Sequence, residues 1–536
     1  MKKLFYLVLP LLFAACATQP QESPILTIEG GQVQGVAADI EGVTVYRGIP
    51  YAAPPIGDLR WKEPQPVVPW EGVKVADTFG HPGYQAVHYP GGYTTEWGYG
   101  KESPYSEDCL YLNVWTPAPG KTDAKLPVAL WIHGGGYREG WGSEPEFDAQ
   151  EWAAKGVVLV SINYRLGVFG FLTHPELSAE SPHGVSGNYG ILDQIESLKW
   201  IQKNIEQFGG DPANVMIFGQ SAGAGSVKTV CESPLSKGLF NKAVIMSGGG
   251  ITNPNTVAAA PAGRMGRYAP MTLAEAEQAT KKIMDWGGYD SLEKMRRAST
   301  EMMYTIGNFY AQVTGDRATR MTGSPIVDGY VSLQSFDNAA YANALPNIPY
   351  MIGYTQDDMG DMAPGIAEFC LNRESVGDKA YAYEFARPLP TDGRGNVLSG
   401  AFHSSDLWYV FKSLQHCWRP WTQGDWDLSE VMLTAWTNFA KYGDPNGPDG
   451  GEWKPYTQED GKFMLFKLDE NDAENSETGE PIPSQNRRFP FKTIWSALTE
   501  HSFFFVNNVS YDVSFISRLK RIFHISERMY NFTLRK

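Results

Sequence analysis

The 536-residue sequence has only five cysteines, and none of them shows the ligand spacing of a zinc site. It has no run of about 18 apolar residues, which excludes a transmembrane helix. Basic residues are in the minority, because 45 Lys and Arg stand against 60 Asp and Glu, for a net charge of −15. A general nucleic-acid binder needs clustered positive charge to meet phosphate, so the composition argues against that class.

The first residues have the pattern of an export signal. A lysine pair precedes an apolar run from Leu4 to Ala15, which is too short to span a membrane. The run ends in Ala-Ala-Cys16, which resembles the lipobox of bacterial lipoproteins. We therefore expect a signal peptide over 1–15, lipidation of Cys16, a tether over 16–24 and a place in the bacterial cell envelope. The alternative is an ordinary signal peptide, cleaved after Ala15 or Ala17, and a periplasmic or secreted protein.

Four further cysteines, at positions 109, 231, 370 and 417, lie beyond this leader. Export permits disulfides, but four cysteines allow three pairings and the sequence does not choose among them. Cys231 lies in an apolar helical stretch, which predicts a buried free thiol.

Short strands joined by Gly and Pro turns are expected from residue 25 to about 120, and strands then alternate with helices. Short apolar runs predict buried strands at Pro127–Ile132, Val157–Ile162, Val215–Phe218 and Ala243–Met246. This alternation predicts an α/β fold with a mainly parallel sheet covered on both faces. A helical insertion is expected over residues 263–320, where Thr272 with Glu275 forms a capping box and Asp290 with Glu293 starts a second helix.

The last fifty residues differ in charge from the rest. Residues 487–536 contain nine Lys and Arg against three Asp and Glu. Two interpretations stay open, namely a membrane-surface segment attracted to anionic lipid and a packed C-terminal helix or fortuitous extension. We expect residues 25–486 to form a single catalytic domain.

The pentapeptide Gly219-Gln220-Ser221-Ala222-Gly223 fits the pattern G-x-S-x-G of a nucleophile elbow. A predicted strand stands directly before it and a predicted helix directly after it, as that turn requires. The tight turn exposes the serine hydroxyl, and the helix N-terminus aims free N–H groups at developing negative charge.

A serine hydroxyl needs a base, and the base needs an acid, in the chain order Ser, acid, His. His403 precedes a helix start and is expected in a loop, whereas His416 is expected near the end of an apolar helix from Asp406 to Leu414. We therefore favour His403. The acid is expected just after a strand at Tyr350–Tyr354, where Asp358 is the better candidate. Asp357 is the runner-up, although a solvated loop is the expected place of Asp357 and Asp361.

A glycine run, His133-Gly134-Gly135-Gly136-Tyr137, follows the strand predicted at Pro127–Ile132. Such a run leaves backbone N–H groups free to bind an oxyanion, together with the N–H of the residue after the nucleophile. A phosphate cradle would need a Lys-Ser/Thr sequel, and Tyr137-Arg138-Glu139 does not supply one. We expect His133 itself to be a hydrogen-bonded wall residue.

At this point the chain resembles the type-B carboxylesterase/lipase family, the cholinesterase-like branch of the α/β-hydrolases. Beyond the serine pentapeptide, the matching segments include Tyr46–Ala52, Glu107–Val114, Asn163–Arg165, Gly187–Gly190, Pro325–Gly329 and Gly443–Asn446. The resemblance implies an α/β-hydrolase fold, with a mostly parallel mixed sheet and helical insertions that form a cap over the active-site gorge.

The resemblance also implies residue roles. It implies Ser221 as nucleophile, Asp358 as acid and His403 as base, with oxyanion donors at Gly135, Gly136 and Ala222. It implies a supporting role for the buried Ser247 and ion pairs of Arg60 with Glu107 and of Arg165 with Asp193. The chain departs from many relatives at Gln220 and Asp358, where they have Glu, and it lacks an upstream cysteine to pair with Cys109.

The favoured function is a serine carboxylesterase that acts on a small-molecule ester and needs no metal and no cofactor. A catalytically silent binding or adhesion module is the alternative from another class, and a lipase, thioesterase or amidase is the alternative among enzymes. Rings between Tyr84 and Tyr105, among them Tyr93 and Trp97, could line a gorge mouth, although packing of the loop is the expected role. The natural substrate and the oligomeric state stay open.

Overall fold

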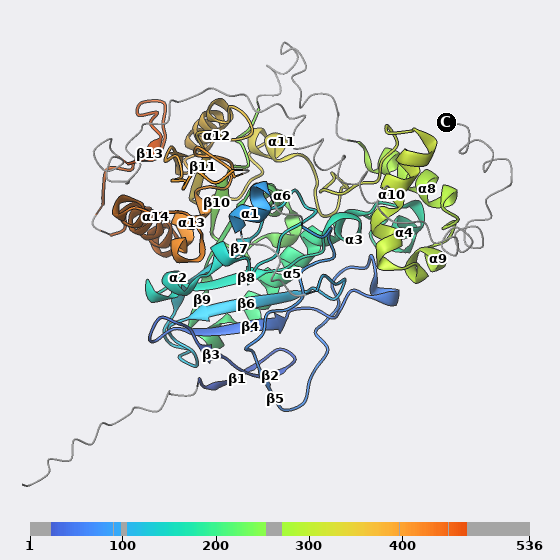
Figure 1. The fold of residues 1–536 in the computed structure, drawn as a ribbon, viewed down its shortest axis with the longest axis horizontal. Coiled ribbons are helices and arrows are strands. Elements are labelled where there is room, and N and C mark those ends of the chain that lie inside the picture. Colours follow the sequence, from blue (N-terminus) through green and yellow to red (C-terminus); the bar gives the residue numbers. More distant parts are fainter. Residues whose placement is uncertain are drawn as a thin grey trace, which may run out of the picture.

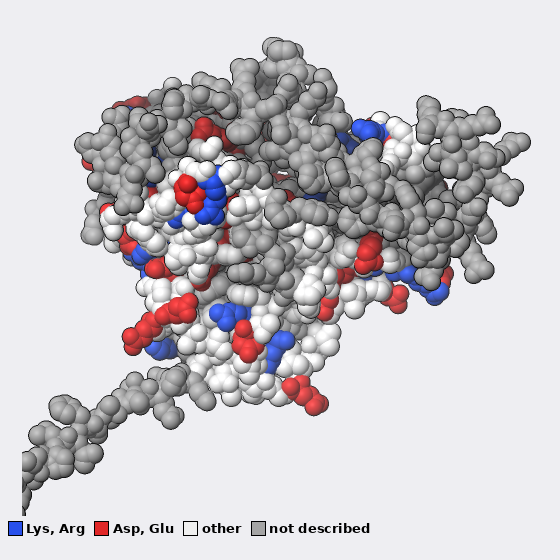
Figure 2. Space-filling model, viewed as in Figure 1, with Lys and Arg blue, Asp and Glu red and all other residues white. Residues whose placement is uncertain are grey.

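The computed structural model describes residues 23–88, 91–97, 104–252, 271–395, 397–448 and 450–468. The predicted signal peptide, Cys16 and the basic tail lie outside these residues, and the predicted domain boundaries stay predictions. Within the described ranges, no helix is long and apolar enough to cross a membrane. On the face shown in Figure 2, described Lys and Arg side chains lie among Asp and Glu side chains rather than in one patch of a single sign.

A ten-stranded mixed sheet forms the centre of the described chain (Figure 1). Its order is β13-β12-β11-β10-β9-β7-β8-β6-β4-β3. Neighbours from β13 to β8 pair in parallel, and β6, β4 and β3 pair antiparallel. A small second sheet has the order β1-β2-β5. The strands are β1 Ile25–Ile28, β2 Gly31–Gln34, β3 Val36–Ala37, β4 Thr44–Pro50, β5 Val73–Val75, β6 Tyr111–Thr116, β7 Leu126–Ile132, β8 Val158–Ile162, β9 Gly210–Gln220, β10 Lys242–Met246, β11 Tyr350–Thr355, β12 Ala380–Phe385 and β13 Met464–Phe466.

The central strands are buried on both faces, as their continuous apolar runs predicted. In β9, Val215 and Ile217 belong to one hydrophobic core, and Met216 and Phe218 belong to the other. This division follows because successive side chains of a strand point to opposite faces. Helices α5, α6, α11 and α12 contribute to the first core, and α2, α13 and α14 contribute to the second. The predicted α/β fold, a mainly parallel sheet covered on both faces, is thereby confirmed.

The helices lie between and around these strands. Their bounds are α1 Gly92–Trp97, α2 Gln150–Ala154, α3 Gly167–Phe171, α4 Pro175–Glu180, α5 Tyr189–Asn204, α6 Ala222–Glu232, α8 Leu273–Trp286, α9 Leu292–Arg297, α10 Thr300–Thr314, α11 Phe336–Tyr341, α12 Ala363–Ser375, α13 Leu407–Phe411 and α14 Gln423–Tyr442.

The predicted helical insertion is present as α8, α9 and α10, which gather at one end of the molecule beside α4 (Figure 1). Thr272 and Glu275 form the predicted capping box of α8. The start predicted at Asp290 is wrong by one residue, because the Ser291 hydroxyl caps α9 while Asp290 pairs with Lys294. The three helices share a separate apolar core with α3 and α4.

Two further predictions meet the structure in the second half of the chain. The helix predicted from Asp406 to Leu414 is interrupted, because α13 ends at Phe411 and Lys412 takes a left-handed φ of 50°. The cysteines at positions 109, 231, 370 and 417 are all free, and the predicted burial of Cys231 is confirmed.

Candidate active site

The turn between β9 and α6 carries Ser221 at the carboxyl end of a central strand. Ser221 has φ 58° and ψ −121°, a conformation that costs energy for a residue other than glycine. A Cβ on Gly223 would lie 2.1 Å from the carbonyl oxygen of Ile132, so only glycine permits this close crossing of β7 and the elbow. The backbone N–H of Ser221 donates to the carbonyl of Met246 at 2.9 Å, which ties the turn to β10.

The structure brings His403 to this serine from far along the chain. His403 Nε2 lies 2.8 Å from Ser221 Oγ, and His403 Nδ1 lies 2.6 Å from Asp358 Oδ1. The three side chains that the sequence singled out therefore form one continuous series of hydrogen bonds. His403 is only 7% exposed, so these bonds operate largely out of water.

The electrostatics of Asp358 favour its ionised form. Burial raises the pKa of this carboxyl, but the hydrogen bond and charge of His403, together with the Ser247 hydroxyl, lower it below its ordinary value. The backbone N–H of Met359 also donates to Asp358 Oδ1, at 2.7 Å. An ionised carboxylate holds the proton of His403 on Nδ1, which leaves Nε2 to accept the proton of Ser221.

Asp357, the runner-up acid, turns to a different partner. Its Oδ2 accepts a hydrogen bond of 2.8 Å from the backbone N–H of Ala401, and its own N–H donates to the carbonyl of Ala401 at 3.0 Å. Asp357 is exposed, as expected for a solvated loop, and it also anchors the loop that carries His403. Asp361 is exposed.

His416 lies apart from this arrangement. It ends a short 3-10 turn at Leu414–His416 rather than the predicted longer helix. Its Nε2 lies 3.0 Å from Asp148 Oδ2, and this hydrogen bond raises the pKa of His416.

The glycine run after β7 crosses directly beside the elbow. A Cβ on Gly134 would lie 3.2 Å from the Cβ of Ser221, and one on Gly135 would lie 2.0 Å from the carbonyl oxygen of Glu139. Gly135 also has φ 90°, so no other residue fits there. Among the described residues, no hydrogen bond uses the N–H of Gly135, Gly136 or Ala222. Three backbone amides are thus available to an anion next to Ser221.

Two neighbours of this site were also singled out in the sequence. Gln220 is 3% exposed, and its Nε2 lies 3.3 Å from His403 Nε2, so an uncharged amide lies against the imidazole. Ser247 is buried, and its hydroxyl is close enough to lower the pKa of Asp358. Within the described chain, no atom lies in hydrogen-bonding geometry with its Oγ. Burial lowers the pKa of His133 to about 4, and its Nδ1 lies 3.0 Å from the Gly134 oxygen, which fits the predicted wall residue.

Sequence reasoning missed two groups that interact with this arrangement, Asp406 through its charge and Tyr93 through a hydrogen bond. Asp406 is fully buried, and burial raises its pKa to about 7, with a hydrogen bond of 3.1 Å from the Tyr383 hydroxyl. Tyr93 of α1 donates its hydroxyl to the backbone carbonyl of His403 at 3.0 Å. The position of Asp406, three residues after His403 in the sequence, could have pointed to it. Nothing in the local sequence around Tyr93 indicates that its side chain reaches His403. Trp97 is buried against Trp408, so this ring packs the loop.

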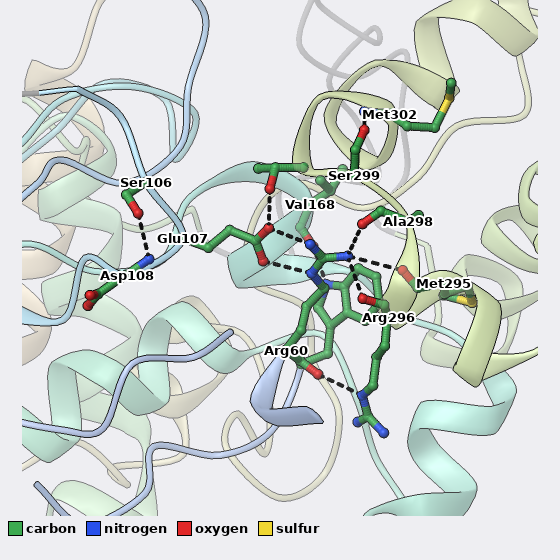
Figure 3. Close-up of polar contacts among 12 residues, drawn as sticks. Arg60, Ser106, Glu107, Asp108, Val168, Met295, Arg296, Ala298, Ser299 and Met302 are labelled. Atoms are coloured by element: carbon green, nitrogen blue, oxygen red, sulfur yellow. Dashed lines mark hydrogen bonds and ion pairs between the residues drawn. The ribbon is translucent and has the colours of Figure 1, made fainter. Parts of the chain in front are cut away.

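Both ion pairs that the resemblance implies are present and buried. Arg60 and Glu107 form the implied pair, with Nε to Oε2 at 2.7 Å (Figure 3). Arg60 also donates to the carbonyls of Met295 and Ala298, at 3.1 and 2.9 Å, and so attaches the N-terminal loops to the helical insertion (Figure 3). Arg165 and Asp193 form the second implied pair, with Nη2 to Oδ1 at 2.7 Å and almost no exposure.

The arrangement offers a polarised hydroxyl, a base with an ionised acid behind it and a set of free amides. These are the parts that nucleophilic acyl transfer requires. In the part of the chain that the structure describes, no group of three or more His, Cys, Asp or Glu side chains could hold a metal ion.

Comparison with known proteins points to the same chemistry. A model of the carboxylesterase family matches residues 22–370 and 363–482. The chain is 34% identical over 495 residues to a fumonisin B1 esterase of Sphingopyxis macrogoltabida, covering 82% of this chain and 85% of that relative. It is 30% identical over 515 residues to a para-nitrobenzyl esterase of Bacillus subtilis strain 168, covering 86% of this chain and 99% of that relative.

Solved structures of carboxylesterases are similar to this structure over most of both chains. A PNB esterase has a TM-score of 0.66 and 28% identity, covering 82% of this chain and 95% of that chain. A Geobacillus stearothermophilus carboxylesterase, solved at pH 6.8, also has a TM-score of 0.66, with 29% identity over 83% of this chain and 96% of that chain.

Proposed function

The chain belongs to the carboxylesterase family and is a carboxylic ester hydrolase, and from this premise we propose that Ser221, His403 and Asp358 are its catalytic triad. The observation that carries the proposal is the continuous contact from Ser221 Oγ through the two nitrogens of His403 to Asp358, at 2.8 and 2.6 Å. The substrate is a small-molecule ester.

In the first half of the reaction, Ser221 Oγ attacks the ester carbonyl while His403 Nε2 takes its proton. The tetrahedral oxyanion is bound by the backbone N–H groups of Gly135, Gly136 and Ala222, which need no reorganisation because they are already free. His403 then donates its proton to the departing alcohol, which leaves an acyl group on Ser221.

In the second half, a water molecule replaces the alcohol. His403 takes a proton from this water, the resulting hydroxide attacks the acyl carbon, and the same amides bind the second oxyanion. His403 returns the proton to Ser221 Oγ as the carboxylic acid leaves. Asp358 remains ionised throughout and stabilises the imidazolium that forms twice in each cycle.

The test is substitution of Ser221 by alanine, with hydrolysis of a p-nitrophenyl ester as the readout. The control is Ser375→Ala, which removes an exposed hydroxyl at the end of α12. We expect Ser221→Ala to fold and to lose nearly all hydrolysis, while Ser375→Ala retains it. Hydrolysis at the normal rate by folded Ser221→Ala would refute the proposal.

We further propose that the protein is exported as a bacterial lipoprotein anchored at Cys16. The charged and apolar leader followed by Ala-Ala-Cys supports this, and the match of the family over residues 22–482 supports a catalytic domain at 25–486. The measurement is detergent phase partition of the whole-cell product. The protein should enter the detergent phase, and Cys16→Ser should move it to the aqueous phase. Equal partition of both forms would refute the anchor.

A further inference from the structure

Arg138 stands at the rim of the proposed oxyanion hole. It follows Gly136 by two residues, so their Cα atoms are at most about 7 Å apart. Its backbone N–H donates to the carbonyl of Gly135 at 3.0 Å, which makes its position part of the same turn. The residue is exposed, so its guanidinium reaches solvent rather than the core.

Arg138 differs from most arginines of the protein in its partners. Its neighbour Glu139 lies 3.4 Å from the ring of His88, and Arg138 forms no ion pair with any described residue. Eight other described arginines pair with an Asp or Glu, namely Arg60, Arg165, Arg296, Arg297, Arg373, Arg387, Arg394 and Arg419. An arginine whose backbone belongs to the turn of the oxyanion glycines thus has no acidic partner among the described residues.

The surroundings place this guanidinium between the oxyanion turn and the helical insertion. Arg138 Nε lies 3.9 Å from the position that a Cβ on Gly323 would take. Burial and the charge of Glu139 raise the pKa of Tyr304 on α10, and the charge of Arg138 acts against that rise. Arg138 is therefore near a glycine and a phenol ring. None of the described residues accepts a hydrogen bond from its guanidinium.

We propose that Arg138 is a specificity-determining residue that binds a carboxylate on the substrate, so that the enzyme prefers anionic esters over neutral esters of the same size. The inference rests on the proposed function, because it requires the reacting carbonyl to lie against Gly135 and Gly136. A planar guanidinium matches a carboxylate with two parallel hydrogen bonds. The net charge of −15 repels anions at long range, so this selection operates through the local contact.

The test uses two substrates of equal length, mono-p-nitrophenyl adipate and p-nitrophenyl hexanoate, which differ mainly by a terminal carboxylate in place of a methyl group. The readout is the ratio of kcat/KM for adipate to that for hexanoate, after subtraction of the uncatalysed rate. In Arg138→Gln we expect this ratio to fall about tenfold, the size of one charge-assisted hydrogen bond. Arg138→Lys keeps the charge without the fork, and its ratio should lie between the two.

The matched control is Arg297→Gln, because Arg297 is an exposed arginine of α9 and its loss changes the net charge equally. Its ratio should equal that of the original protein. An unchanged ratio in both Arg138 variants, with both esters still hydrolysed, would overturn the inference and leave the proposed function intact. Failure of the original protein to hydrolyse either ester would overturn both.

Discussion

Asp357 and Ala401 join the two loops that carry the acid and the base. The Asp357 carboxylate accepts the N–H of Ala401 at 2.8 Å, and their backbones bond in addition at 3.0 Å. The next residue, Asp358, contacts His403 directly. The two adjacent aspartates thus have different roles. Asp357 positions the loop that carries His403, and Asp358 orients the imidazole.

This division predicts opposite outcomes for two equivalent substitutions. Asp358→Asn should lower kcat by roughly 10³- to 10⁴-fold, because an amide does not hold the required tautomer or stabilise an imidazolium. Asp357→Asn keeps an oxygen for the Ala401 N–H, so its kcat should stay within about threefold of the original. Steady-state kinetics on a p-nitrophenyl ester check both. Equal losses in the two variants would contradict the assignment of the acid.

The glycine turn makes a steric prediction. Gly135→Ala places a Cβ 2.0 Å from the Glu139 carbonyl, so the turn must shift and its amides move away from the oxyanion. We expect kcat to fall at least about 100-fold, as for loss of an oxyanion donor. Gly377→Ala is the control, because Gly377 also has positive φ but its Cβ would meet no atom within 4 Å. A fully active Gly135→Ala variant would argue against this oxyanion hole.

Asp406 predicts a pH dependence of stability. Its pKa is raised from 3.8 to about 7 in the folded state, so the folded protein binds a proton that the unfolded chain has lost. The free energy of unfolding should therefore decrease as the pH rises from about 4 to about 7, by at most about 4 kcal/mol. Asp406→Asn should remove this decrease, as measured by urea unfolding at several pH values.

The control for this measurement is Asp427→Asn, which replaces an exposed aspartate of α14. Its pH profile should follow that of the original protein. If Asp406→Asn also keeps the original profile, the buried carboxyl does not titrate in this range.

The buried pair of Arg165 and Asp193 predicts a large effect on stability. Arg165→Met leaves the Asp193 carboxylate buried without its cation, which should cost about 3–5 kcal/mol of unfolding free energy. Chemical denaturation measures this loss. Arg297→Met, which breaks an exposed pair on α9, should leave the melting temperature unchanged. Equal stability of the two variants would mean that the buried pair is not required.

The central layers could be predicted from sequence because their determinants are local. Apolar runs such as Val215–Phe218 favour burial on both faces, and the glycines around Ser221 permit the sharp turn between strand and helix. The order of the motifs along the chain then restricted the base to a few histidines. The cores on the two sides of β9 follow directly from its alternation of side chains.

The remaining features depend on contacts between distant segments, which no local pattern encodes. Lys412 ends α13 with a left-handed φ between Phe411 and Leu414, which both belong to the second core, and no local pattern in the sequence marks this stop. The anchoring role of the exposed Asp357 has no local signal, because its partner, Ala401, lies 44 residues away. Burial raises the pKa of Asp406, and its hydrogen-bond partner Tyr383 lies 23 residues earlier, in β12.

Covalent labelling tests the central claim most directly. A fluorophosphonate probe reacts with a serine that has an activated hydroxyl, and peptide mass spectrometry locates the modified residue. The account predicts one label per chain, on Ser221, with ester hydrolysis lost in proportion, and little labelling in His403→Ala. A label on another residue, or full hydrolysis after complete labelling of Ser221, would contradict it.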